Sequence, residues 1–86
     1  MKPVRCAVVG LGRIGSMLED DPLREKPCTH AGAMAESPDC LLVGGCDLDE
    51  ERNRLFERRW GRPAYRDLDR LIDETAPRLA AVATPP

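Results

Sequence analysis

The stretch "CAVVGLGRIGSML", from Cys6 to Leu18, decides the fold. Four apolar residues lead directly into glycines, and the residues that follow suit the start of a helix. Gly10, Gly12 and Gly15 have the spacing GxGxxG between a strand and a helix, which predicts a loop that binds the phosphates of a dinucleotide. The alternative is a tight turn that merely contains many glycines, and the glycines by themselves do not exclude it.

Each glycine of this loop has a separate mechanical role. Gly10 permits the tight turn, Gly12 leaves no side chain where the pyrophosphate approaches, and Gly15 allows close packing of helix on strand. The main-chain amides of Arg13 and Ile14 are expected to point at phosphate oxygens, because a helix N-terminus presents free N–H groups and a partial positive charge. We therefore predict that these residues contact the cofactor.

An acidic residue is required at the end of the second strand, where it accepts hydrogen bonds from the ribose hydroxyls. Asp47 follows the apolar run that begins at Cys40. It lies 32 positions after Gly15 rather than the usual ~20, and we attribute the excess to an insertion over residues 20–29, which contains two prolines. Since Leu48 and not arginine comes next, and the carboxylate repels a 2′-phosphate, the sequence predicts NAD rather than NADP.

Strand-like and helix-like segments alternate along the chain. The alternation predicts an α/β fold, a partial doubly wound parallel sheet of about four strands with helices on both faces. Strands are expected at residues 4–10, 40–47, 63–65 and 79–83, and helices at residues 13–19, 30–37, 49–60 and 67–76.

The last two helices carry recognisable end signals and apolar stripes. Gly61 is expected to end one helix, and Asp67 to cap the start of the next. The predicted buried stripes consist of Leu55, Phe56 and Trp60 in the first of these helices and Leu68, Leu71 and Ile72 in the second.

Composition limits the class of protein. The 86 residues suffice for one small domain, with 42% hydrophobic and 33% charged residues and a net charge of −2. The balanced charge gives no indication of a nucleic-acid or membrane partner. The four cysteines include no CxxC pair, so we predict no metal site and a cytoplasmic location, with the thiols of Cys6 and Cys46 buried in strands.

Four segments together resemble the Gfo/Idh/MocA oxidoreductases. They are "AVVGLGRIGSM", "LLVGGCDLDEER", "AYRDLDRLID" and "LAAVATPP". The resemblance implies that Thr84 and Pro85 line the cofactor pocket toward the nicotinamide. It also implies an oxidoreductase that transfers hydride between nicotinamide and a sugar, polyol or related compound.

In that family the catalytic groups come later in the sequence, so no catalytic residue is assigned here. The resemblance therefore implies that residues 1–86 are an incomplete N-terminal NAD(P)-binding domain, and that the C-terminal substrate domain is absent from this chain. A homo-oligomer is compatible with this interpretation. The tripeptide "EKP" at Glu25–Pro27 matches a family motif in letters only, because it precedes the second strand, and neither Lys26 nor the single His30 receives a chemical role.

Two other functions remain open from the sequence. One is a non-enzymatic module that senses NAD or another nucleotide, since binding and catalysis use the same loop. The other is a methyltransferase-like domain that binds S-adenosylmethionine.

Overall fold

The computed structural model describes residues 2–12 and 29–83. The predicted alternation of strands and helices is confirmed within these residues, whereas the helix expected at residues 13–19 lies outside them. The elements are β1 (Val4–Val9), α1 (His30–Glu36), β2 (Cys40–Cys46), α2 (Glu50–Trp60), β3 (Ala64–Tyr65), α3 (Leu68–Thr75) and β4 (Leu79–Val82).

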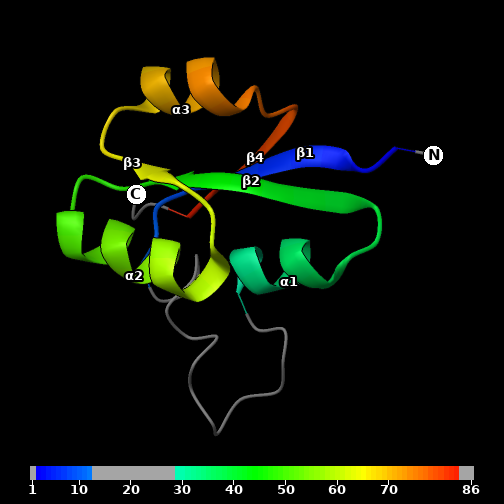
Figure 1. The fold of residues 1–86 in the computed structure, drawn as a ribbon, viewed down its shortest axis with the longest axis horizontal. Helices are drawn as coiled ribbons and strands as arrows, with labels where there is room; N and C mark the ends of the chain where they lie inside the picture. The colour runs from blue at the N-terminus through cyan, green and yellow to red at the C-terminus, as the bar shows by residue number, and fades with distance from the viewer. Residues whose placement is uncertain (1, 13–28, 84–86) are drawn as a thin grey trace, which may run out of the picture.

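The four strands form one parallel sheet in the order β3-β2-β1-β4. Figure 1 shows α3 on one face of the sheet, and α1 and α2 on the opposite face. The predicted fold class is therefore confirmed. Because β1 and β2 run parallel and Val9 lies opposite Cys46, the loop after β1 and the residues after β2 begin side by side at the carboxyl edge of the sheet.

The hydrophobic core has two layers, one on each face of the sheet. The layer beneath α1 and α2 consists of Cys6, Val8, Leu11, Ala31, Met34, Leu42 and Phe56. The layer beneath α3 consists of Ala7, Cys46 and Leu71. Successive residues of β1 thus serve opposite layers, as the pleat requires, and the prediction of a strand buried on both faces is confirmed. Cys6 and Cys46 are buried free thiols, also as predicted.

Two glycines in β2 allow the helices to approach the sheet closely. A Cβ on Gly44 would lie 2.9 Å from Cδ1 of Leu71, and a Cβ on Gly45 would lie 2.9 Å from Cδ2 of Leu11. The second of these contacts involves the glycine loop after β1, because the Leu11 side chain fills the space over Gly45.

Side chains and a glycine define the helix ends. Thr29 caps α1, Asp49 caps α2 and Asp67 caps α3, each by accepting hydrogen bonds from amides of the first turn. Gly61 ends α2 with φ at 66°, a left-handed conformation that suits glycine. The predicted roles of Asp67 and Gly61 are confirmed.

The predicted apolar stripes are wrong in part. Leu55 is 38% exposed, and Asn53 occupies the buried position of α2 with Phe56. Of the predicted stripe in α3 only Leu71 is buried, whereas Leu68 and Ile72 are about half exposed. A periodic apolar pattern identifies a candidate face, but burial also requires a packed neighbour, and α3 contacts chiefly β2 and β3.

The two border strands of the sheet differ in how their edges are covered. The amide of Ala64 in β3 donates to Oε2 of Glu57, 3.3 Å away, rather than to the neighbouring strand. At the opposite border, Leu79 and Val82 of β4 are 55% and 67% exposed. The outer side of β3 is thus occupied by a carboxylate, while β4 presents apolar side chains to solvent.

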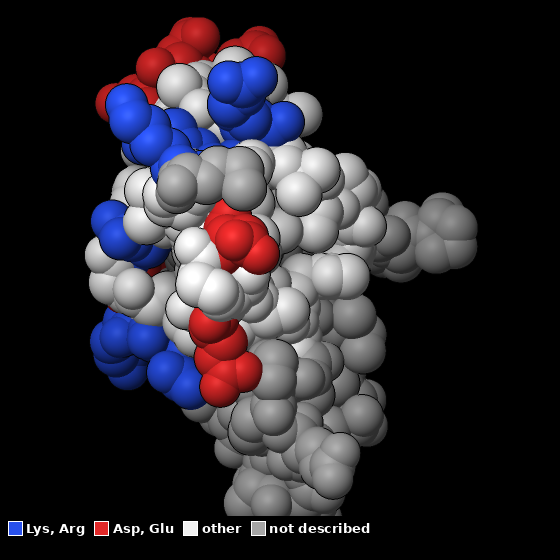
Figure 2. All heavy atoms as spheres, turned by 90° about the vertical axis from the view of Figure 1, so that its right-hand side faces the viewer, with Lys and Arg blue, Asp and Glu red and all other residues white. Residues whose placement is uncertain are grey.

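Charged side chains are distributed rather than gathered on the side of the molecule that Figure 2 shows. Figure 2 shows basic and acidic side chains in separate small groups, with uncharged residues between them, so neither sign covers this side of the molecule. Within residues 2–12 and 29–83, no helix has the length and apolar character needed to span a membrane.

Candidate dinucleotide-binding site

The glycine loop leaves β1 through a turn that favours glycine. Gly10 has φ at 94°, and its amide donates to the carbonyl oxygen of Cys46 at 2.8 Å. The next residue, Leu11, is 1% exposed and turns its side chain into the core against Phe56. The loop is therefore held on one side by β2 and on the other by the hydrophobic layer beneath α2.

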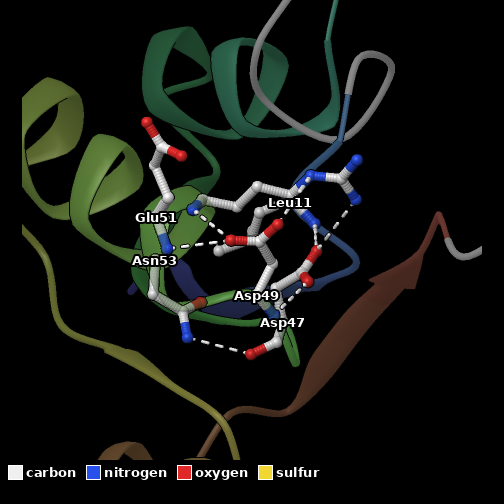
Figure 3. A network of polar contacts seen from close by, with 6 residues as sticks. Leu11, Asp47, Asp49, Glu51 and Asn53 are labelled. Atoms are coloured by element: carbon white, nitrogen blue, oxygen red, sulfur yellow. Dashed lines mark hydrogen bonds and ion pairs between the residues drawn. The ribbon is translucent and has the colours of Figure 1, made fainter.

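Asp47 faces this loop directly. Its Oδ2 accepts a hydrogen bond from the Leu11 amide at 2.8 Å, as the close view in Figure 3 shows. The bond joins the residue after β2 to the middle of the GxG segment. An acid at this position can reach a ligand bound over the loop, which is the orientation that ribose recognition requires.

The second oxygen of Asp47 is also fixed. Oδ1 accepts from the Asp49 amide at 2.8 Å, while the Asp47 carbonyl accepts from Nδ2 of Asn53 at 2.9 Å. The Asp47 amide donates to the carbonyl of Tyr65 at 3.0 Å. With its side chain only 11% exposed, the carboxylate is held in one orientation by both its main chain and its oxygens.

Gly12 leaves the mouth of the loop free of a side chain. Among the described residues, a Cβ at this position would meet no atom closer than 3.5 Å, and that atom is Nη1 of Arg52. The described side chains therefore leave room over Gly12, which fits the close approach of a phosphate to the main chain.

The residues described here fit the adenosine part of a dinucleotide. An ionised carboxylate offers about four acceptor positions, and Asp47 uses two of them for amides, so two remain for the ribose hydroxyls. Gly12 provides main chain without a side chain beside it. When bound, NAD would supply the hydride donor or acceptor at its nicotinamide end.

The structure brings together three of the predicted site residues, namely Gly10, Gly12 and Asp47. The remaining predicted residues, Arg13, Ile14, Gly15, Thr84 and Pro85, lie outside the described residues. Sequence reasoning missed Leu11, Arg52 and Asn53. Of these three, only Leu11 could have been recognised from the sequence, because it is an apolar residue within a glycine loop that follows a buried strand.

The thiol next to the acid is kept neutral. Burial, and then the negative charges of Asp47 and Asp67, raise the pKa of the Cys46 thiol above its ordinary value. A neutral buried thiol behaves as a small apolar group, so Cys46 packs under the site instead of adding charge to it. Within the described parts of the chain, no group of three or more His, Cys, Asp or Glu residues could hold a metal ion.

Comparison with known proteins agrees with this geometry. The model of an oxidoreductase family with an NAD-binding Rossmann fold matches residues 4–86. The chain belongs to the Gfo/Idh/MocA family. The resemblance noted in the sequence is thus confirmed, and so are the Rossmann fold and NAD as the cofactor of the family. Among curated protein sequences, none matches the chain significantly.

Solved structures of this kind share the fold over almost the whole chain. A protein assigned as a dehydrogenase, from Bordetella bronchiseptica RB50, is 28% identical with a TM-score of 0.77, and the match covers 99% of this chain and 19% of that one. The WlbA dehydrogenase from Bordetella pertussis, in complex with NADH and UDP-GlcNAcA, is 27% identical with a TM-score of 0.75, over 98% of this chain and 22% of that one.

A third similar structure shares the fold at lower identity. The myo-inositol 2-dehydrogenase from Lactobacillus plantarum is 23% identical with a TM-score of 0.73, and the match covers 98% of this chain and 22% of that one. The Gfo/Idh/MocA chain described here therefore spans about a fifth of the length of these structures.

Proposed function

We propose that residues 1–86 form the N-terminal part of the NAD-binding domain of an oxidoreductase whose substrate domain and catalytic residues lie outside this chain. The observation that carries the proposal is the hydrogen bond from the Leu11 amide to Oδ2 of Asp47, because it sets the predicted ribose acceptor against the predicted phosphate loop. The family match over residues 4–86 supports the same assignment.

Each predicted residue then has a defined task. Gly10, Gly12 and the amides of Arg13 and Ile14 bind the pyrophosphate, with Gly15 allowing the helix to pack closely. Asp47 accepts hydrogen bonds from the adenosine ribose. Thr84 and Pro85 line the pocket toward the nicotinamide.

The proposed reaction is hydride transfer between nicotinamide and a sugar, polyol or related compound. Support comes from the WlbA dehydrogenase from Bordetella pertussis, whose structure is a complex with NADH and UDP-GlcNAcA. The proposed location is the cytoplasm, and the proposed assembly is a homo-oligomer. No described residue gives specific support to a nucleotide sensor or to an S-adenosylmethionine-binding domain.

Titration of the purified protein with NADH and with S-adenosylmethionine tests the assignment. We expect NADH to bind, with enhanced nicotinamide fluorescence and competition by NAD. Exchange of Asp47 for Asn should weaken that binding, whereas exchange of the remote exposed Asp73 for Asn should leave it unchanged. Tighter binding of S-adenosylmethionine than of NADH, or no NADH binding at all, would overturn the proposal.

A further inference from the structure

Three sulfur-containing side chains gather toward the amino edge of the sheet, away from the cofactor site at its carboxyl edge. Cys6 and Met34 belong to the hydrophobic layer beneath α1 and α2, and Cys40 packs against that layer. Cys6 and Met34 are buried, whereas Cys40 is half-buried. The three side chains therefore form a cluster that extends from the core to the surface.

The register of β1 and β2 brings the two thiols of this cluster together. Cys40 of β2 lies opposite Val4 of β1. Cys6 is two positions beyond Val4, so it is a diagonal neighbour of Cys40 on the same face of the sheet. Burial, and then a hydrogen bond with the Cys40 thiol, raise the pKa of the Cys6 thiol. The two thiols are thus neutral neighbours in the folded protein.

The diagonal separation suits a bridging ion better than a direct bond between the sulfur atoms. Diagonal neighbours on paired strands lie about 7 to 8 Å apart, and a disulfide needs Cα atoms within about 7 Å of each other. A metal ion between two thiolates adds two bonds of about 2.3 Å each. Such an ion spans the wider gap without a shift of either strand.

A cavity beside Cys40 gives an ion access to the cluster. It has a volume of about 170 Å³ and lies between the end of α1, the start of β2 and the end of α2. Cys40 and Met34 both line it. Arg62 lines it as well, and its positive charge offsets the negative charge that two thiolates and one monovalent cation carry together.

We propose that Cys6, Cys40 and Met34 form a binding site for a soft monovalent cation, with Cu(I) as the ion that these ligands select. Thiolate and thioether sulfur favour Cu(I), whereas Mg²⁺ and Ca²⁺ favour oxygen ligands. On binding, two S–H bonds give way to two Cu–S bonds, two protons pass to solvent, the thioether donates a lone pair, and copper remains Cu(I). Structural zinc takes four ligands, so this set of three does not suit zinc.

A titration with Cu(I) tests the site. The acetonitrile complex of Cu(I) is added without oxygen to the reduced, purified protein in competition with bicinchoninate, whose colour reports the copper that the protein leaves unbound. We expect one tightly held equivalent per chain and a rise in melting temperature, because the ion binds the folded arrangement. Zn²⁺ at the same concentration should give neither effect.

A matched pair of cysteine variants locates the ion. Cys6→Ala and Cys46→Ala each remove one buried thiol from a strand, but on opposite faces of the sheet. Cys6→Ala should bind Cu(I) at least about 100-fold more weakly, since even the loss of an outer partner of a metal ligand costs about 10- to 100-fold. Cys46→Ala should bind as the wild type does, and Met34→Leu should give an intermediate affinity.

A variant of the half-buried ligand keeps the test independent of folding. Cys40→Ser should lose the ion and, without metal, should melt as the wild type does. Absence of Cu(I) binding by the wild-type protein, or undiminished binding by Cys6→Ala or Cys40→Ser, would overturn the inference. Loss of the ion in Cys46→Ala or in Cys28→Ser would also overturn it, because neither thiol belongs to the proposed set. A copper-free protein with a mass lower by two hydrogens would identify a disulfide in place of the site.

Discussion

The Leu11 amide and the Asp47 carboxylate are joined by a hydrogen bond of 2.8 Å between residues 36 positions apart in the chain. The same carboxylate that is expected to bind the ribose therefore also positions the loop that is expected to bind the phosphates. Two parts of one site depend on a single side chain.

Exchange of Asp47 for Asn should affect stability and cofactor binding together. The amide of Asn can accept from only one of the two N–H groups that Asp47 now accepts from, Leu11 and Asp49, and it turns an NH₂ toward the other. We expect a loss of about 1 to 3 kcal/mol in the free energy of unfolding and about 10- to 100-fold weaker NADH binding. Urea denaturation and fluorescence titration measure the two effects, and a loss of only one would contradict the double role.

Two glycine exchanges should separate packing from binding. A Cβ on Gly45 would lie 2.9 Å from Leu11 and 3.1 Å from Phe56, so Gly45→Ala should cost about 1 to 3 kcal/mol by overpacking. Among the described residues, a Cβ on Gly12 would meet no atom closer than 3.5 Å, so Gly12→Ala should leave the melting temperature nearly unchanged while weakening NADH binding. The reverse pattern would show that Gly12, rather than Gly45, is required for packing.

Exchanges at the C-terminal ends of two helices should change the stability of the protein in opposite directions. Gly61 ends α2 at φ 66° and Ala76 ends α3 at φ 47°, both in the left-handed region. Gly61→Ala should destabilise the protein by about 1 kcal/mol, and Ala76→Gly should stabilise it by a few tenths to about 1 kcal/mol. Calorimetric melts measure both, and destabilisation by Ala76→Gly would refute the explanation from backbone conformation.

Stability should fall at alkaline pH. Burial raises the pKa of the Cys6 and Cys46 thiols above the ordinary value of 9.0, so the unfolded chain loses these protons at lower pH than the folded protein. The unfolding free energy contributed by the neutral thiols is fully present below pH 9.0 and declines as the pH rises toward the raised folded values. Denaturation between pH 8 and about 10 measures the slope.

A cysteine variant provides the control for this pH dependence. Replacement of Cys46 by Ala removes one titrating thiol and should make the decline shallower. Tyr65, whose pKa is also raised, chiefly by burial, titrates from a higher ordinary value of 10.0. An identical slope in the wild type and in Cys46→Ala would exclude the Cys46 thiol as a cause.

Much of the fold could be predicted because its signals are local. The cap at Asp67, the helix end at Gly61 and the acid after β2 each follow from residue type and immediate context. The exposure of Leu68 and Ile72 could not be predicted, because a periodic pattern does not say what packs against it. The burial of Asn53 could not be predicted either, because it depends on a hydrogen bond from Nδ2 of Asn53 to the carbonyl oxygen of Asp47.

The candidate site, like the fold, could be predicted only in part from the sequence. Gly10, Gly12 and Asp47 follow from the motif and its position between strands. The hydrogen bond from Leu11 to Asp47 depends on the parallel register that sets Val9 opposite Cys46. The position of Arg52 beside Asp47 depends on how α2 is oriented after its N-cap. The number of residues between Asp47 and Arg52 does not reveal that orientation.

The hydrogen bond from Ala64 to Glu57 determines at which border of this small sheet a further strand can be added. An acceptor from α2 already occupies the outward main-chain hydrogen of β3, so another extended segment finds no free donor at Ala64. Among the described strands, the opposite border at β4 is where a neighbouring polypeptide can join by main-chain pairing. Exchange of Glu57 for Lys would remove this acceptor and leave the Ala64 amide of β3 able to pair with another extended segment.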